Sequence, residues 1–471
     1  AGKKGAEQAG GLELAWHCIR AGRQAEAEPF LLKGAREALS HGAPHESERA
    51  LATGIEWIRG SARIQAQLIL VEVLQEQGRW IDSLTAIASL PPALLPDDAD
   101  NAGILRALAS FALEDLTVAS ASLAIEQLTA VIESSPVAYT RIAAANAVSV
   151  VCGRLRVPEI ASTALVCVES IGDPDVAPEE RMKLWLAKAQ LAYHAGDSSY
   201  SERHLRSAAE LLEHTHVASS LAGRVYTGLA SHAVLRGDYR TALEHGLKAH
   251  AIANRVGDEL RIASVPSNLA LYHARLGNVS SQIEYAEQSL RLTGTAFLGL
   301  AEIQASYFRS MGYAAQGRAD AAVVALEEMQ TKLPQEAPRW AHQLWSLFKA
   351  DVLSVLGRRR EAIALAARTV EDAYRTGFQA PYKGLLARWI ALCVRSQGEA
   401  HVAKDHLLKM RSEMEPLALL DRTEITCALA GVNRYLGVTD VSVERDLRHL
   451  LSTLPAAVAR DLERIGALPS G

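Results

Sequence analysis

The segment GDYRTALEHGLKA, residues 237–249, decides how this chain folds. Ala242 and Ala249 lie seven residues apart in it, on one face of a predicted helix. A further small residue, Ala230, lies seven residues before Gly237. Small side chains at both places let two helices joined at the glycine approach closely. We therefore predict an antiparallel helical hairpin with Gly237 in its turn.

The same pattern recurs along the chain at intervals of 39 to 43 residues from residue 153 onward. The residue seven before the glycine is small in eight of ten cases, and so is the residue five after it. The ten glycines that mark the pattern are Gly22, Gly78, Gly153, Gly196, Gly237, Gly277, Gly317, Gly357, Gly398 and Gly437. One hairpin cannot cover its own apolar face, so hairpins of this kind stack into a continuous array.

The composition narrows the classes of protein that fit the chain. Its 471 residues are 49% hydrophobic and 22% charged, enough to form a large core. The net charge of −5 gives no basic field for a phosphate backbone, so we expect no nucleic-acid partner. The longest apolar stretches are too short to span a bilayer, and we expect no membrane association. Five scattered cysteines indicate a reducing compartment and a cytoplasmic location.

We predict an all-α fold, a right-handed superhelical solenoid of about ten hairpins over residues 11–455. Residues 1–10 are expected to form a disordered terminus or linker. Residues 456–471 are expected to form a C-terminal capping helix and tail. Bends in the array are expected near residues 91–103 and 171–178, where prolines gather between units.

One hairpin resembles a tetratricopeptide (TPR) repeat. The residues that carry this resemblance are Gly237, Asp238, Tyr239, Ala242 and Ala249, with Leu229 and Ala230 ahead of them. The period exceeds the roughly 34 residues of the usual repeat. The chain is therefore similar to the long-helix variety of the TPR, over essentially residues 11–455.

A second resemblance lies at the N-terminal end. Residues 12–51, LELAWHCIRAGRQAEAEPFLLKGAREALSHGAPHESERAL, resemble the first repeat that follows the nucleotide-binding part of bacterial STAND signal-transduction ATPases. The match is carried by Ala21 to Arg23, Ala27, Ala35, Ala38 and Gly42 with Ala43. This resemblance implies a C-terminal sensor array that binds a ligand and signals to a switch domain outside these residues. The alternative is a free-standing TPR scaffold or adaptor that joins two proteins.

Sequence motifs for catalysis are absent. The chain has no phosphate-binding GxxxxGK[ST] loop and no GxGxxG after a strand, so we expect neither ATP hydrolysis nor a nucleotide cofactor. Histidines are densest around His214 and His216, but residues two apart on a helix do not share a face, and we expect no metal site. We predict a binding protein with no cofactor rather than an enzyme.

The first helix of each hairpin should line the concave face, where repeat arrays bind protein or peptide ligands, or a small-molecule effector. Positions 13, 10, 6 and 3 residues before the glycines project there. The candidate partner-binding residues among them are Lys183, Tyr193, Arg224, Gln304, Tyr307, Arg388, Arg395 and Arg434. Arg388, Arg395 and Arg434 could together bind a carboxylate of the partner. Alternatively, Glu424 and Asp351 neutralise Arg388 in an internal network.

Overall fold

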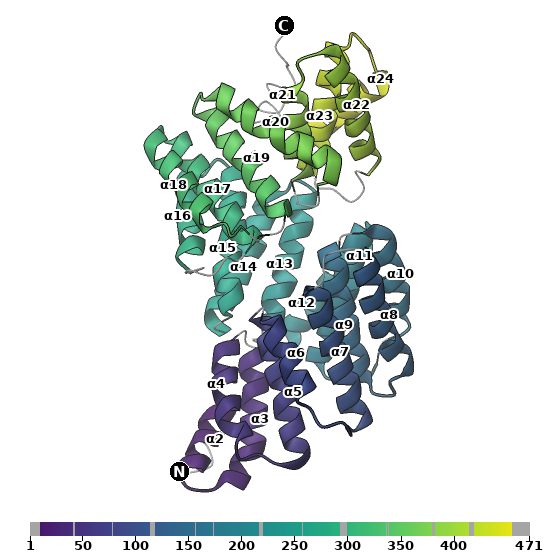
Figure 1. The fold of residues 1–471 in the computed structure, drawn as a ribbon, viewed down its shortest axis with the longest axis vertical. Coiled ribbons are helices and arrows are strands. Elements are labelled where there is room, and N and C mark those ends of the chain that lie inside the picture. Colours follow the sequence, from purple (N-terminus) through teal and green to yellow (C-terminus); the bar gives the residue numbers. More distant parts are fainter. Residues whose placement is uncertain are drawn as a thin grey trace. The chain divides into compact units, whose positions relative to one another are not determined.

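A computed structural model gives the fold of the chain (Figure 1). It describes residues 10–40, 43–77, 79–113, 118–155, 157–172, 174–215, 220–256, 258–292, 299–335, 337, 339–378, 382–413 and 419–454. Within these ranges all regular structure is α-helical and no strand occurs, which confirms the predicted fold class.

The chain divides into two compact units, which we describe separately. Unit 1 comprises residues 1–226 and 251–261, and unit 2 comprises residues 227–250 and 262–471. The helices that lie wholly in unit 1 are α2 (Gly11–Arg20), α3 (Gln24–Ser40), α4 (Pro44–Ile55), α5 (Gly60–Glu76), α6 (Trp80–Ala88), α7 (Pro96–Leu113), α8 (Val118–Ser134), α9 (Ala138–Leu155), α10 (Pro158–Glu169), α11 (Pro178–Ala195) and α12 (Ser198–Thr215). Those wholly in unit 2 are α16 (Val279–Leu292), α17 (Leu300–Ala315), α18 (Ala319–Lys332), α19 (Arg339–Val355), α20 (Arg359–Thr376), α21 (Lys383–Cys393), α22 (Gln397–Ser412), α23 (Leu419–Tyr435) and α24 (Val441–Thr453). Residues of both units occur in α13 (Ser220–Leu235), α14 (Tyr239–Val256) and α15 (Glu259–Arg275).

Most of the glycines form the predicted hairpin turns. Their backbone has a positive φ of 69° to 91°, a left-handed conformation that residues with a Cβ rarely adopt, at Gly22, Gly196, Gly237, Gly277, Gly317, Gly357 and Gly437. The small residues beside the turns are buried where the two helices meet, as at Ala350 and Ala362, both 0% exposed. The hairpin prediction is therefore confirmed at these seven turns.

Two glycines of the series do not lie in turns, and Gly78 is outside the described residues. Gly153 lies inside α9, and the next helix begins at Pro158, a residue well suited to a first helical position. Gly398 lies in the first turn of α22. The side chain of Ser396 accepts a hydrogen bond from the Glu399 N–H at 3.3 Å, and this N-cap starts α22 before the glycine.

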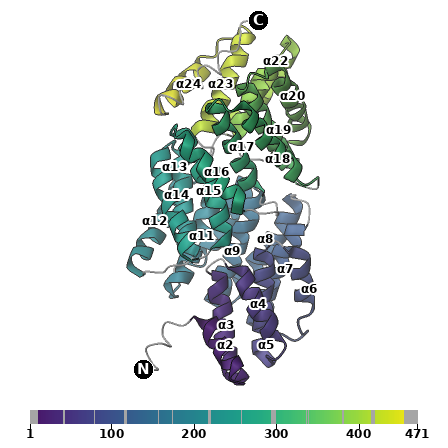
Figure 2. The same cartoon turned by 90° about the vertical axis from the view of Figure 1, so that its left-hand side faces the viewer.

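In unit 1 the first helices of successive hairpins pack in a row from α5 onward, since α5 contacts α7, α7 contacts α9, and α9 contacts α11. The second helix of the first hairpin, α3, contacts α5. Helices α2 and α3 form the first hairpin and lie side by side in both views (Figures 1 and 2). The additional helix α4 lies between this hairpin and α5, which explains the long spacing from Gly22 to Gly78. Successive hairpins thus share one continuous layer of helices.

Unit 2 repeats this packing and also curls until its ends meet. Its row of first helices runs through contacts of α17 with α19, α19 with α21, and α21 with α23. A Cβ added to Gly237, in the first turn of the unit, would lie 3.0 Å from Leu419 and 3.5 Å from Leu454 near its last hairpin. The inner row of helices in unit 2 therefore encloses a central space.

The expected segment boundaries remain predictions. Residues 89–95 connect α6 to α7, and the rest of the expected bend region, residues 96–103, lies within α7. Residues 170–177, apart from residue 173, connect α10 to α11. The expected capping helix over residues 456–471 and nearly all of the segment 1–10 lie outside the described residues. Among the helices that are described, none is both long and apolar enough to cross a membrane.

Candidate functional site

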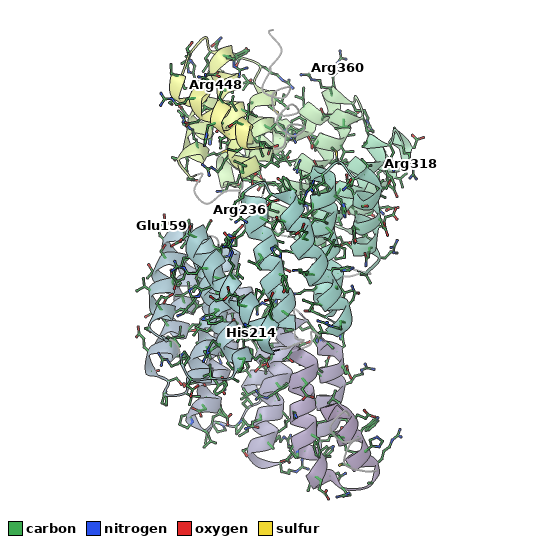
Figure 3. All side chains as sticks on the ribbon, turned by 180° about the vertical axis from the view of Figure 1, so that it is seen from behind. Glu159, His214, Arg236, Arg318, Arg360 and Arg448 are labelled. Atoms are coloured by element: carbon green, nitrogen blue, oxygen red, sulfur yellow. The ribbon has the colours of Figure 1, made fainter. Side chains whose placement is uncertain are left out.

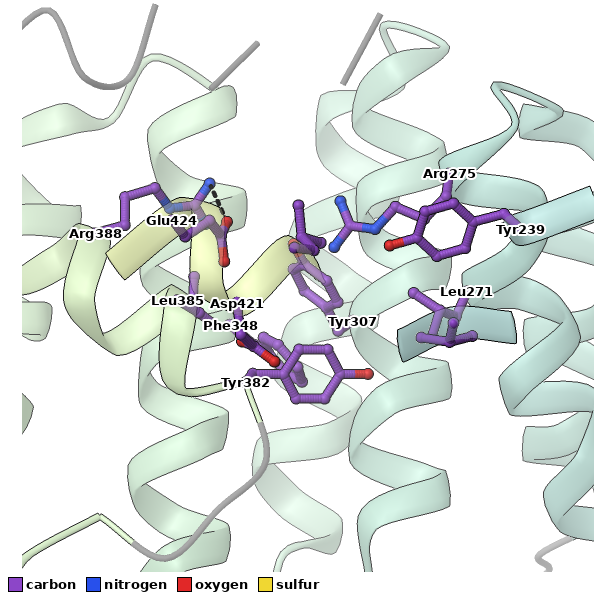
Figure 4. Close-up of a pocket in the computed structure, with 12 residues that line it drawn as sticks. Tyr239, Leu271, Arg275, Tyr307, Phe348, Tyr382, Leu385, Arg388, Asp421 and Glu424 are labelled. Atoms are coloured by element: carbon purple, nitrogen blue, oxygen red, sulfur yellow. Dashed lines mark ion pairs between the residues drawn. The ribbon is translucent and has the colours of Figure 1, made fainter. Parts of the chain in front are cut away.

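The inner row of unit 2 surrounds a cavity of about 80 Å³ (Figure 4). That volume exceeds the roughly 10–15 Å³ needed to hold one water molecule. The lining is contributed by α13 to α15, α17, α19, α21 and α23, through Val234, Tyr239, Leu271, Arg275, Tyr307, Phe348, Tyr382, Leu385, Arg388, Leu420, Asp421 and Glu424. The lining combines five apolar residues, three tyrosines and four charged residues, and the volume suits a small group such as a single side chain.

On one side of the cavity, Asp351 organises a buried polar network. Its carboxylate accepts one hydrogen bond from the Tyr307 hydroxyl and another from Arg388 Nη2, each 2.7 Å long. Arg388 Nη1 also lies 4.0 Å from Glu424 Oε1. Burial alone would lower the pKa of Arg388, but the charges of Asp351 and Glu424 outweigh it and raise this pKa. The charge of Arg388 is thus used within the protein.

Aromatic rings form a second side. Tyr307 stacks on Phe348 with ring centroids 4.0 Å apart, and Tyr382 meets Phe348 edge-on at 5.1 Å. The Tyr382 hydroxyl donates to Gln304 Oε1 at 2.7 Å, and Gln304 Nε2 donates to the Ser267 carbonyl at 2.9 Å. Tyr382 itself has a φ of 70°, an uncommon conformation for a residue with a Cβ. These hydrogen bonds hold the strained residue over the cavity.

The acidic side is built by close approach of α21 to α23. The Gly384 N–H donates to Asp421 Oδ1 at 2.7 Å, and a Cβ at Gly384 would lie 2.3 Å from Glu424 Oε2. Burial raises the pKa of Asp421 and raises that of Glu424 to about 7. Glu424 therefore changes its charge near neutral pH.

Arg275 and Tyr239 complete the lining, and neither side chain forms a hydrogen bond or an ion pair with the described residues. The Nε atom of Arg275 is buried without a hydrogen-bond partner. Among the described residues, no carboxylate lies close enough to Arg275 to form an ion pair, for which the limit is 4.0 Å. No described residue forms a hydrogen bond with the Tyr239 hydroxyl. Burial raises the pKa of Tyr239, which keeps its hydroxyl protonated as a donor.

The structure brings three of the eight predicted site residues together. Tyr307 and Arg388 line the cavity, and Gln304 supports it from behind Tyr382. The internal alternative for Arg388 is the arrangement observed, because both Asp351 and Glu424 lie beside it. The role of these residues in binding a partner stays a prediction.

Arg395 and Arg434 do not join Arg388 at the cavity, so the expected cluster of three arginines does not form. Arg395 lies in the turn after α21 and is exposed, because α21 ends at Cys393. Arg434 is also exposed, and its Nε atom lies 3.5 Å from Glu444 Oε1 on α24.

The remaining three candidates belong to unit 1. Lys183 pairs with Glu180 at 2.6 Å on its own helix, α11, and the ring of Tyr193 contacts that of His194 at 5.4 Å. Arg224 lies on α13, where burial and the like charge of Arg261 lower its pKa to about 10. None of these three residues lines the cavity of unit 2.

The sequence pattern does not predict that Arg275, Tyr382 and Asp421 line a cavity. It includes Tyr239 only as a residue of the TPR-like repeat. Arg275 lies two residues before Gly277, a position that the projection onto the concave face did not include. Tyr382 lies between helices, where no periodicity applies. The described residues contain no group of histidine, cysteine and carboxylate side chains that could hold a metal ion.

Comparisons with known proteins support the fold. No model of a known protein family matches the chain, and no curated protein matches its sequence. The apo form of RapI superposes with a TM-score of 0.50 at 10% identity, covering 79% of this chain and 98% of RapI. The human IFIT1 dimer with m7Gppp-AAAA gives 0.45 at 13% identity, covering 95% and 88%. A Pyrococcus horikoshii STAND protein with a tetratricopeptide repeat sensor gives 0.39 at 12% identity, covering 88% of this chain and 56% of that one. The chain is thus an all-α array of TPR-like hairpins, and at these identities the likeness defines the fold alone.

Proposed function

We propose that this chain is a binding module without catalytic activity, and that the cavity of unit 2 receives a segment of a protein or peptide partner. The observation that carries the proposal is the lining of the cavity, to which seven helices contribute and which combines aromatic rings with charged groups. Aromatic and arginine side chains, of which the lining has several, are enriched at the centres of protein interfaces. A small-molecule effector is the second kind of ligand that such a cavity could hold.

Peptide selection tests this proposal directly. The purified chain is used to select from a random peptide library, and the affinities of the selected peptides are measured by fluorescence polarisation. Leu271→Trp should fill the cavity and abolish binding. Val324→Trp, which adds the same ring at a position 52% exposed on α18, should leave binding unchanged. Failure to select any peptide, or equal binding by Leu271→Trp, would contradict a peptide-binding cavity.

The larger role that we propose is that of the sensor array of a STAND-type ATPase. Ligand binding would then act through its different affinity for two states of the array, and so bias a switch domain outside these residues. This proposal rests on the resemblance of residues 12–51 to the first repeat of such sensors. The alternative is a free-standing scaffold that joins two proteins.

The polypeptide upstream of Ala1 distinguishes the two roles. A sensor requires a phosphate-binding loop there, and ATP hydrolysis by the longer protein should change when a selected peptide is added. A scaffold requires neither. The exclusion of a nucleic-acid partner stays a prediction from the net charge of −5.

A further inference from the structure

We propose that the cavity of unit 2 binds a carboxylate group of the partner, held by the guanidinium of Arg275 and the hydroxyl of Tyr239. This inference rests on the proposed binding function and specifies the chemical group that the cavity recognises. It assigns the recognition to residues other than the arginines that the sequence indicates.

Arg275 differs from Arg388 in what surrounds it. Both arginines line the cavity, but Arg388 has Asp351 at 2.7 Å, whereas no carboxylate of the described residues lies within ion-pair distance of Arg275. The Nε atoms of both arginines are buried without a hydrogen-bond partner, so the difference lies in the Nη atoms, which in Arg388 pair with Asp351. Burial alone would lower the pKa of Arg275, but the neighbouring tyrosines and Glu424 raise it, so the guanidinium stays charged. It forms no hydrogen bond with the described residues, and a carboxylate ligand would supply the missing acceptors.

Tyr239 places a second donor beside the first. Its side chain is buried, only 2% exposed, and in Figure 4 its hydroxyl points toward the guanidinium of Arg275. A planar carboxylate has two oxygens, which suit the forked donors of an arginine and leave a lone pair for a hydroxyl. The two side chains come from helices of neighbouring hairpins, α14 and α15, which pack closely where Gly246 meets Leu269 and Tyr272, so this packing fixes them relative to each other.

The other charged groups of the cavity determine when the carboxylate can bind. Asp351 and Arg388 neutralise each other, which leaves Arg275 facing Asp421 and Glu424. A further anion would be repelled by two ionised acids. Because burial gives Glu424 a pKa of about 7, we expect Glu424 to be protonated when the carboxylate is bound. Binding should therefore be coupled to uptake of one proton and strengthen as the pH falls from 8 to 6.

The probes are sodium acetate and its neutral isostere acetamide, with inorganic phosphate as the competing anion, and binding is followed by saturation-transfer NMR on the full chain. We expect acetate to bind at least tenfold more tightly than acetamide or phosphate, and more tightly at pH 6 than at pH 8. Glu424→Gln should retain acetate binding and remove its pH dependence. Equal binding of acetate and acetamide, or a preference for phosphate, would overturn the proposal.

Variants assign the effect to the two residues. Arg275→Gln should abolish acetate binding and Arg275→Lys should restore part of it, whereas Arg360→Gln, at an exposed hairpin tip that extends from the ribbon in Figure 3, should have no effect. Tyr239→Phe removes only the hydroxyl and should weaken binding severalfold without unfolding the protein, as circular dichroism would show. Unchanged affinity in both Arg275→Gln and Tyr239→Phe would refute the assignment.

The outcome is separable from that of the proposed function. If selected peptides bind in the cavity but tolerate replacement of every carboxylate by an amide, the carboxylate inference fails and the binding module stands. If acetate binds as expected but no peptide does, the anion site stands and the peptide function fails.

Discussion

Replacing Asp351 with alanine should destabilise unit 2 more than other single changes around the cavity. Asp351 is only 8% exposed and accepts 2.7 Å hydrogen bonds from Tyr307 and Arg388. Without it, the Tyr307 hydroxyl loses its acceptor and Arg388 keeps only Glu424, 4.0 Å away. Breaking a buried ion pair costs about 3–5 kcal/mol. We expect a loss near the lower limit, since Glu424 ionises more readily once the neighbouring negative charge is gone.

Urea denaturation at pH 7, followed by far-UV circular dichroism and by tryptophan fluorescence, measures this loss. Three of the seven tryptophans, Trp340, Trp345 and Trp389, lie in unit 2, so fluorescence reports on both units. A midpoint that differs between the two signals would show that the array unfolds in parts. The control Asp405→Ala removes an equal charge from an exposed position on α22 and should change the free energy of unfolding by less than about 0.5 kcal/mol.

A double variant tests the physical reason. Asp351→Leu combined with Arg388→Met replaces both charges with apolar groups and should be more stable than Asp351→Ala, because no buried charge is left unpaired. A loss below about 1 kcal/mol for Asp351→Ala, or a double variant that is less stable than the single one, would show that the ion pair does not hold the inner row together.

Three further predictions concern stability. Burial raises the pKa of Glu424 from 4.5 to about 7, so its contribution to the free energy of unfolding is complete below pH 4.5 and is lost as the pH rises to about 7. Over that window the free energy of unfolding should fall by up to about 3 kcal/mol relative to Glu424→Gln. Parallel pH profiles of the two proteins would contradict this. Gly34→Ala should destabilise the protein by about 1–3 kcal/mol, because the new Cβ would lie 2.3 Å from the backbone nitrogen of Leu12. Gly103→Ala, which has open space around it, should stabilise α7 by about 0.5–1 kcal/mol. Urea midpoints of the two variants that move in the same direction would refute this prediction. Ser396→Ala should cost about 1 kcal/mol through loss of the N-cap of α22, and an unchanged midpoint would show that this cap is not needed.

The hairpins themselves could be predicted from the sequence because their determinants are local. A glycine in a left-handed turn and an alanine on each side act within about 12 residues of one another, as at Gly357 with Ala350 and Ala362. Where another local signal was stronger, the glycine pattern was wrong. Ser396 starts α22 two residues before Gly398, and this shift moves Arg395 from a helix face into a turn.

The site depended on tertiary structure. Gln304, Tyr307 and Arg388 were found from their positions relative to the glycines, since the inner face of a helix follows from its period. Which arginine is neutralised could not be found in this way, because Asp351 lies 37 residues from Arg388 and meets it only when α19 packs on α21. Arg275 faces Glu424 across a cavity that exists only because unit 2 curls until its first and last hairpins meet. The sequence by itself therefore determined the repeating hairpin and the face that turns inward, and the curvature of the stacked hairpins decided which charges meet.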